Sequence, residues 1–241
     1  MPVPVGRGDV QALLAEGAQL LDVLDEDEFT RSRLPGATNL PLAELTPERL
    51  DSLDADAPLI VYGASLQDDR GPRASRLLEH YGFGAVHDYE AGKDDWLAYG
   101  LPFEGDGTLL VLHLLDPCVC TGADERAGEL RSRLDQRGVG LAVLVDEGDI
   151  VLGTVSRAAL QEVEAAAPAA ALVDLDPITV RPSTTADALA RRLAAERRTV
   201  ALVTTSSGRL LGQVSTARLT GREPLHPVRH ERPLAPLAVA G

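Results

Sequence analysis

The segment Leu152-Gly153-Thr154-Val155-Ser156 recurs 59 residues later as Leu211-Gly212-Gln213-Val214-Ser215. The same offset relates Leu134 to Leu193, so the similarity extends well upstream of the motif. Self-similarity at a fixed period is the signature of a repeated supersecondary unit. The sequence therefore predicts two copies of one unit, which we place at residues 109–165 and 168–222.

Each copy has the pattern of a strand, a helix, two further strands and the start of a second helix. In the second copy, Ile178–Val180 and Val200–Val203 have the β-branched and aliphatic composition of buried strands. Ser206-Ser207-Gly208 predicts a hairpin turn before the strand at Leu210–Ser215. The sequence therefore indicates a βαββα unit in both copies.

The helix of the second copy is predicted to begin at a capping box, because Thr184 is followed three residues later by Asp187. Leu189, Leu193 and Ala194 are expected to line its buried side at helical spacing.

Residues 1–104 have a different pattern of predicted elements, in which strands alternate with helices. A helix over 8–16 precedes a strand over 20–24, and a second apolar strand over 59–62 precedes a helix that carries Pro72 in its first turn. This alternation predicts a parallel sheet with helices on both faces. Binding sites in such sheets lie beyond the carboxyl ends of the strands, which directs attention to the loop after Tyr62.

The charge of the chain limits its partners. There are 23 basic and 37 acidic residues, which gives a net charge of −14. So acidic a chain repels phosphate backbones and anionic bilayers, so we expect no nucleic-acid partner and no membrane partner. The sequence has no apolar stretch of the roughly 20 residues that a membrane span needs, and we expect a cytoplasmic protein.

Three motifs in the first half resemble the rhodanese family of sulfurtransferases. They are Leu20-Leu-Asp-Val with Asp27-Glu28-Phe29, then Leu34-Pro35-Gly36-Ala37-x-Asn39-Leu-Pro41, and finally Ala91-Gly92-x3-Trp96-x3-Gly100-Leu-Pro102. The resemblance implies a rhodanese-like α/β fold over residues 1–104.

The family's chemistry implies a persulfide-carrying cysteine directly after the Tyr62 strand. Here that position is Gly63, and residues 1–104 contain no cysteine. The family's loop arginine corresponds to Arg70, while Ser65 is the local hydroxyl and is interpreted as a hydrogen-bonding residue of the loop. We therefore predict a degenerate sulfurtransferase site with no catalytic residue.

The repeated unit resembles the cystathionine-β-synthase (CBS) domain, present as a tandem pair. The resemblance rests on the segment Asp176-Pro-x-Thr-Val180 and on the two Leu-Gly-x-Val-Ser motifs. The resemblance implies a regulatory module that pairs into a homodimer. It also implies clefts for an adenosyl ligand, either an adenine nucleotide (AMP, ADP or ATP) or S-adenosylmethionine.

Nucleotide-binding members of that family carry a hydroxyl and an aspartate after the last strand, and both contact the ribose. This chain has the hydroxyls of Ser156 and Ser215 but has Ala159 and Arg218 at the aspartate positions. Arg157 and Arg218 are interpreted either as phosphate contacts at the cleft mouth or as exposed first residues of a helix. The candidate ligand-binding residues are therefore Ser156, Arg157, Ser215 and Arg218.

The remaining candidates are two cysteines and two histidines. Cys118 and Cys120 are two residues apart on a predicted strand, so they point to one face, either as small buried residues or as a redox or sulfur-accepting pair. Two ligands do not make a zinc site. His226 and His230 have helical spacing but flank Pro227 in a proline-rich tail over 223–241, so we expect no metal site.

These observations favour a non-catalytic regulatory or ligand-sensing protein, with a degenerate rhodanese-like domain joined to a CBS pair. The alternatives are a sulfur-handling protein that uses Cys118 or Cys120, and an interaction scaffold in which both sites are inactive.

Overall fold

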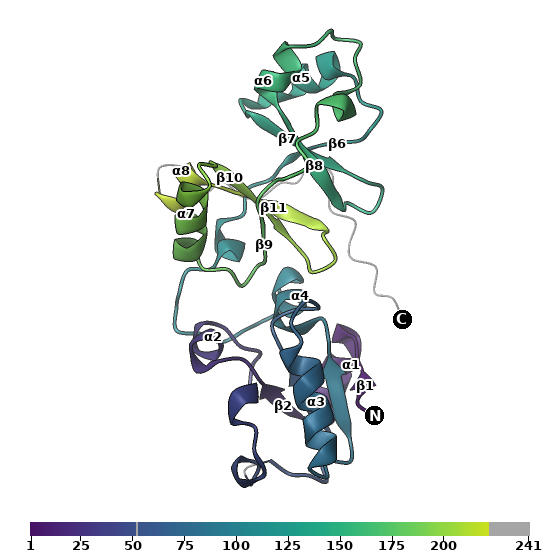
Figure 1. Cartoon of the computed structure of the whole chain (residues 1–241), viewed down its shortest axis with the longest axis vertical. Helices are drawn as coiled ribbons and strands as arrows, with labels where there is room; N and C mark the ends of the chain where they lie inside the picture. The colour runs from purple at the N-terminus through teal and green to yellow at the C-terminus, as the bar shows by residue number, and fades with distance from the viewer. Residues whose placement is uncertain (52, 222–241) are drawn as a thin grey trace. The chain divides into compact units, whose positions relative to one another are not determined.

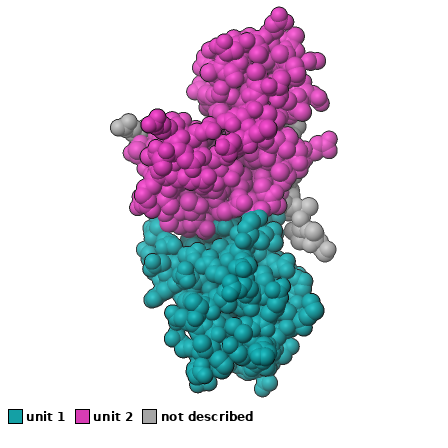
Figure 2. All heavy atoms as spheres, viewed as in Figure 1, with its two compact units in different colours: residues 1–109 teal, residues 110–241 magenta. Residues whose placement is uncertain are grey.

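The computed structural model describes residues 1–51 and 53–221. These residues form two compact units, which divide between Leu109 and Leu110 (Figures 1 and 2). The proline-rich tail and its two histidines lie outside the described residues.

The first unit is built on a five-stranded sheet in which every pairing is parallel. The strand order is β1 (Val3–Pro4), β5 (Val86–Tyr89), β4 (Leu59–Tyr62), β2 (Gln19–Asp22) and β3 (Thr38–Asn39). The connections contain α1 (Arg7–Ala15), α2 (Glu26–Arg31), α3 (Arg70–His80) and α4 (Gly92–Ala98), with short 3₁₀ turns η1 (Leu42–Glu44) and η2 (Pro47–Arg49). This topology confirms the predicted doubly covered parallel sheet.

Successive residues of the central strands enter two different cores because side chains alternate across a sheet. Leu21 and Val61 pack in one apolar cluster with Leu78 of α3, whereas Leu20 and Ile60 pack in the other cluster with Val10 and Trp96. Both faces of the sheet are therefore buried, which explains the near-continuous apolar sequence of β2 and β4.

The second unit contains two three-stranded sheets of identical topology. The first has β6 (Val119–Thr121), β7 (Leu141–Val145) and β8 (Val151–Ser156), and the second has β9 (Thr179–Val180), β10 (Val200–Thr204) and β11 (Leu210–Ser215). In each, the middle strand pairs parallel with the first strand and antiparallel with the third. Two βαββα repeats confirm the predicted CBS-like architecture.

The helices of the second unit follow the same repeat. They are α5 (Ala127–Arg137) and α6 (Arg157–Gln161) in the first copy, and α7 (Ala186–Ala195) and α8 (Thr216–Leu219) in the second, with 3₁₀ turns η3 (Val111–Leu114) and η4 (Ala169–Leu172). A shared apolar cluster joins the two sheets through Cys118, Val143, Val145, Leu202 and Leu210.

The start of α7 differs from the predicted capping box. Thr185, not Thr184, caps the helix, and its hydroxyl accepts a hydrogen bond from the Ala188 N–H at 3.2 Å. The carbonyl of Thr184 instead accepts from Val111 N–H, because this residue contacts the segment that leads into the first repeat. The buried face is formed by Ala186, Leu189 and Leu193, whereas Ala194 lies about 100° further round and is exposed.

The segment that leads into each repeat pairs with the last strand of the other repeat. Asp116 exchanges two backbone hydrogen bonds with Gln213, at 2.8 and 3.0 Å, and Asp174 does the same with Thr154, at 2.9 and 2.7 Å. These reciprocal pairings relate the two repeats by an approximate two-fold symmetry.

The glycine of each repeated motif lies at one of these crossings. A Cβ on Gly153 would lie 2.5 Å from the Asp174 carbonyl oxygen, and one on Gly212 would lie 3.0 Å from that of Asp116. The motif therefore has glycine so that the backbone of the other repeat can approach.

Gly153→Ala is expected to lower the free energy of unfolding of the second unit by about 2–3 kcal/mol, because the added methyl overlaps backbone that cannot move alone. Gly212→Ala should also destabilise the unit, because it combines a longer contact with a backbone φ of 159° that disfavours a side chain. Gly122→Ala, with open space around it, is the matched control. Urea unfolding measures all three variants, and equal stability of Gly153→Ala and Gly122→Ala contradicts the interpretation.

Candidate functional site

The degenerate sulfurtransferase site that the sequence predicts lies in the loop after β4. Gly63 is its first residue, and a Cβ added there would lie 2.8 Å from Oδ2 of Asp68. That oxygen accepts a hydrogen bond from the Ala64 N–H at 2.7 Å, and Oδ1 accepts from the Arg70 N–H at 3.1 Å. A carboxylate of the chain itself therefore fills the interior of the loop.

Ser65 is buried within the same loop, at 9% exposure. Its hydroxyl oxygen lies 3.4 Å from the Gln67 N–H and from the Gln67 amide oxygen, and its carbonyl accepts from the Asp68 N–H. These contacts stay inside the loop and provide no base for a serine nucleophile.

The guanidinium of Arg70 is occupied by carboxylates. Its Nε donates to both oxygens of Asp68, at 2.9 and 3.1 Å, and Nη1 donates to Glu28 at 2.6 Å. Burial alone would lower the pKa of Arg70, but the hydrogen bonds with Glu28 and Asp68 outweigh burial and raise it. Burial would likewise raise the pKa of Asp68, but the bonds from Arg70 and Ala64 hold it below its usual value. This ion network therefore stays charged.

Lys93, the single lysine of the chain, reinforces the same edge of the sheet. It is 3% exposed, and its Nζ donates to the carbonyls of Glu28 and Ser32 at 3.0 and 2.8 Å. Burial lowers the pKa of Lys93, and the nearby charge of Asp22 opposes that effect. Burial also raises the pKa of Asp22, which ends β2. The Lys93 ammonium therefore has a structural role, because it holds the backbone carbonyls at the end of α2.

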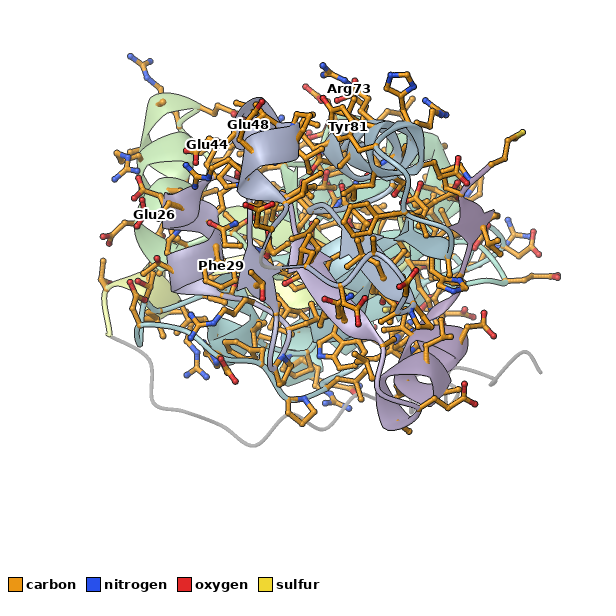
Figure 3. The ribbon with its side chains drawn as sticks, turned by 90° about the horizontal axis from the view of Figure 1, so that it is seen from below. Glu26, Phe29, Glu44, Glu48, Arg73 and Tyr81 are labelled. Atoms are coloured by element: carbon orange, nitrogen blue, oxygen red, sulfur yellow. The ribbon has the colours of Figure 1, made fainter. Side chains whose placement is uncertain are left out.

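A small groove on the first unit, of about 360 Å³, combines apolar and basic side chains. It is lined by Leu42, Arg73, Arg76, Leu77 and His80. Arg73 projects from α3 at the surface and pairs with Asp69 at 3.7 Å (Figure 3).

The second unit encloses a larger cavity of about 890 Å³ between its two repeats, in the size range of small-molecule sites. Ser156 and Ser215, the two candidate hydroxyls, both line it. Further lining comes from the leading segments at 116–119 and 177–178 and from the middle strands at positions 141, 200 and 202. The pairing of the leading segments therefore shapes this cavity.

The two serines have equivalent structural contacts. The Ser156 hydroxyl accepts from the Ala159 N–H, and the Ser215 hydroxyl accepts from the Arg218 N–H, each at 3.1 Å. Each serine thus caps the short helix after its strand. A hydroxyl can still donate its proton into the cavity while it accepts this bond.

Arg157 and Arg218 are placed differently from the predicted cleft mouth, because neither is among the cavity-lining residues in the described chain. Arg157 is half-exposed and pairs with Asp135 at 2.7 Å. The Arg218 side chain is 4% exposed and faces Asp116 across 3.6 Å, so it is not the exposed helix residue of the alternative interpretation. Its guanidinium packs against the leading segment of the first repeat. The sequence around Arg218 does not predict this contact, because Asp116 is far away in the chain.

Two arginines that the sequence analysis did not select line the cavity, namely Arg137 and Arg198. Arg198 follows the end of α7, donates to Asp174 at 2.9 Å and reaches the Asp176 carbonyl at 3.2 Å. Their positions could have identified them in the sequence, because each arginine lies between the end of a helix and the middle strand that follows it.

The cysteines are both free thiols, and Cys118 lines the cavity. Cys118 is buried, whereas Cys120 is half-buried beside it. Burial raises the pKa of the Cys118 thiol, and the neighbouring Cys120 and Asp116 add to that increase. Because the thiolate is the reactive form, this environment disfavours sulfur transfer by Cys118.

Within residues 1–51 and 53–221, no three His, Cys, Asp or Glu side chains gather as a metal site. Every helix of that part of the chain is too short or too polar to span a bilayer.

The comparisons with known proteins agree with this two-part architecture. The family model described as "Rhodanese-like domain" matches residues 7–99, and the model described as "CBS domain" matches residues 170–222. The chain therefore contains a rhodanese-like domain and a CBS domain, and the first repeat has the same topology as the second.

Curated relatives match parts of the chain. An HTH-type transcriptional regulator of Mycobacterium tuberculosis is 32% identical over 35% of this chain, which spans 37% of the regulator's length. The thiosulfate:glutathione sulfurtransferase of Homo sapiens is 29% identical over 39% of this chain and 91% of that protein. Among solved structures, CBSX2 in complex with AMP is 17% identical over 47% of this chain and 95% of that chain, with a TM-score of 0.43.

Asp88 of β5 provides a pH-dependent prediction for the first unit. It is 5% exposed, and burial, followed by the charge of Glu90, raises its pKa from 3.8 to about 6, while Arg76 acts in the opposite direction. Because the folded pKa exceeds the unfolded one, the contribution of Asp88 to stability is largest below pH 4 and is lost as pH rises through 6.

Asp88→Asn should remove this dependence and raise the free energy of unfolding at pH 7.5 by about 1–2 kcal/mol, since the neutral amide carries no desolvated charge. Urea titrations at pH 4.5 and pH 7.5 measure the difference, with exposed Asp69→Asn as the control. An unchanged pH dependence in Asp88→Asn contradicts the assignment.

Proposed function

We propose that this protein is a non-catalytic, cytoplasmic regulatory protein in which a degenerate rhodanese-like domain is coupled to a CBS pair that senses an adenine nucleotide. The observation that carries the proposal is the contrast between its two sites. The sulfur-carrying position is Gly63, inside a loop filled by Asp68 and Arg70. The second unit, by contrast, has a cavity of about 890 Å³ with hydroxyl and guanidinium groups in its wall.

An adenine nucleotide fits the chemistry of that wall. Val139, Leu141 and Ile178 provide apolar surface for a flat base, Ser156 and Ser215 provide hydroxyls for a ribose, and the arginines provide charge for phosphate. S-adenosylmethionine shares the base and ribose but has a cationic tail. The two carboxylates of the wall, Asp116 and Asp174, already face Arg218 and Arg198, so they are poor partners for that tail. We therefore favour AMP, ADP or ATP.

A sulfur-handling enzyme is the second candidate, and its support is the similarity to the human thiosulfate:glutathione sulfurtransferase. That function would need a thiolate from Cys118 or Cys120, outside the rhodanese-like domain. The raised pKa of Cys118 makes this the weaker candidate.

No thiosulfate sulfurtransferase activity is expected, because Gly63 offers no thiolate. Cyanide-dependent formation of thiocyanate should equal the buffer blank for the wild-type chain. Activity above the blank that disappears in Cys118→Ser or Cys120→Ser would replace the proposal with the sulfur-handling candidate.

Phosphorylated nucleotides are expected to bind more tightly than adenosine. Arg198→Ala should weaken the binding of ATP or AMP about tenfold and leave adenosine binding unchanged, because only the phosphates lose a charge-assisted hydrogen bond. Arg191→Ala, an exposed arginine of α7 outside the cavity lining, is the matched control.

Isothermal titration calorimetry provides the test. Equal affinities for adenosine and its phosphates would refute the role of Arg198. A panel of AMP, ADP, ATP, adenosine and S-adenosylmethionine that gives no heat would refute the sensor function and leave the interaction scaffold.

A homodimer through the second unit is part of the proposal. Leu152 of β8 and Leu175 of the segment that leads into the second repeat lie next to the Thr154–Asp174 pairing and are 45% and 76% exposed, and we assign this apolar surface to the dimer contact. Light scattering should give twice the chain mass at micromolar concentration, and Leu175→Asp should shift the protein toward monomer. A wild-type monomer would contradict the dimer.

A further inference from the structure

One face of α3 carries basic side chains around a leucine. Four residues of the helix lie within about 100° of one another around its axis, namely Arg73, Arg76, Leu77 and His80. Together with Leu42 of η1, they line the groove of about 360 Å³ on the first unit. The groove therefore has an apolar floor and a basic rim.

The floor consists of Leu42 and Leu77, which the core beneath them covers only in part. Both side chains are half-buried and pack against the apolar cluster that contains Val61 and Leu78. Their buried atoms hold them in place, and the remaining surface lines the groove. Because apolar surface is stabilised when a partner removes it from water, the floor favours an apolar side chain as its occupant.

The acidic side chains of α3 and η1 are paired with groups outside the groove lining. Glu79 pairs with the N-terminal amine of Met1 at 2.9 Å, and Glu44 pairs with Arg49 at 2.9 Å. Neither carboxylate forms an ion pair with the basic rim.

The arginines of the rim are weakly neutralised. Arg73 pairs with Asp69 at 3.7 Å, but the two side chains are 61% and 76% exposed, and exposed pairs contribute little. In the part of the chain that the structure describes, Arg76 forms no ion pair, although its charge opposes the rise in the pKa of buried Asp88. This is unusual in a unit whose acidic residues outnumber the basic ones by more than two to one.

We propose that this groove is a docking surface for an acidic peptide segment of another protein. One leucine-like side chain of the segment packs on the floor, and its carboxylates pair with Arg73 and Arg76. Charge complementarity selects this occupant, because the exposed cations gain partners while the leucines lose contact with water. The inference goes beyond the proposed function, since it requires neither a nucleotide nor sulfur chemistry.

Other occupants fit the groove less well. The chain's own segment 222–241 has three arginines and two glutamates, so its charge does not complement a basic rim. A nucleic acid brings phosphates, but the acidic excess of the first unit repels them. A groove of about 360 Å³ is near the lower end of the range for small-molecule sites, which suits a peptide side chain.

The first experiment measures the fluorescence anisotropy of a labelled peptide, Asp-Glu-Leu-Asp-Glu-Leu-Glu-Asp, with the full chain at low ionic strength. A second peptide has serine at both leucine positions and the same charge. Wild type should bind the leucine peptide saturably at micromolar concentrations. It should bind the serine peptide at least about fivefold more weakly, because that peptide lacks the apolar contact.

The second experiment changes the rim. Arg76→Glu should weaken binding of the leucine peptide about tenfold, because the reversed charge repels the carboxylates. Arg191→Glu, which makes the same change at an exposed position of α7, is the matched control and should bind as wild type does. Arg76→Gln is the second variant if the glutamate protein fails to fold, and it should weaken binding about threefold.

The proposal is overturned if wild type shows no saturable binding, or if Arg76→Glu and Arg191→Glu lose affinity equally. Equal affinity for the two peptides would also overturn it, since charge alone would then explain binding. A single-stranded oligonucleotide that binds more tightly and displaces the peptide would make the groove a nucleic-acid site instead. A lower mass of Arg76→Glu in light scattering would make it an interface between copies. Absence of nucleotide binding would refute the proposed function without altering these outcomes.

Discussion

The reciprocal pairing of each leading segment with the last strand of the other repeat is the constraint on which the second unit depends. Asp116 pairs with Gln213 and Asp174 pairs with Thr154, so neither repeat completes its sheet surroundings alone. The same crossings place residues 116–119 and 177–178 in the wall of the cavity. The pairing of the repeats and the shape of the cavity therefore depend on the same contacts.

The first unit differs from the second because the loop after β4 has no open cavity: charged side chains of the unit itself fill it. Strands β2 and β4 end where ligands usually bind in parallel sheets. Here the Asp68–Arg70–Glu28 network and the buried ammonium of Lys93 occupy that edge. Opposite charges so closely hydrogen-bonded are costly to separate once buried, which favours a fixed structural domain over a reactive one.

The repeat, the parallel sheet and the two serines that line the cavity could be predicted because they depend on local patterns. Side-chain periodicity and a constant offset of 59 residues are visible in the chain itself. The cap at Thr185, the burial of Arg218 and the inward turn of Asp68 could not be predicted. Each depends on a contact with a segment distant in sequence or on the orientation of one side chain. Asp68 and Asp69 are adjacent in sequence, for example, yet the first side chain is largely buried and the second is exposed. The position of Arg198 between the end of α7 and the middle strand is visible in the sequence, but Arg197 shares that position, so the sequence alone does not select Arg198.

The central claim is that the chain senses a nucleotide between its CBS repeats while its rhodanese-like domain binds no substrate. Hydrogen exchange of the full chain with and without saturating ATP tests both halves of that claim. The account predicts slower exchange at the amides of Asp116, Cys118, Val119 and Ile178 and at residues 198–202, with no change at 63–71. Protection at 63–71, or no protection at either leading segment, would contradict it.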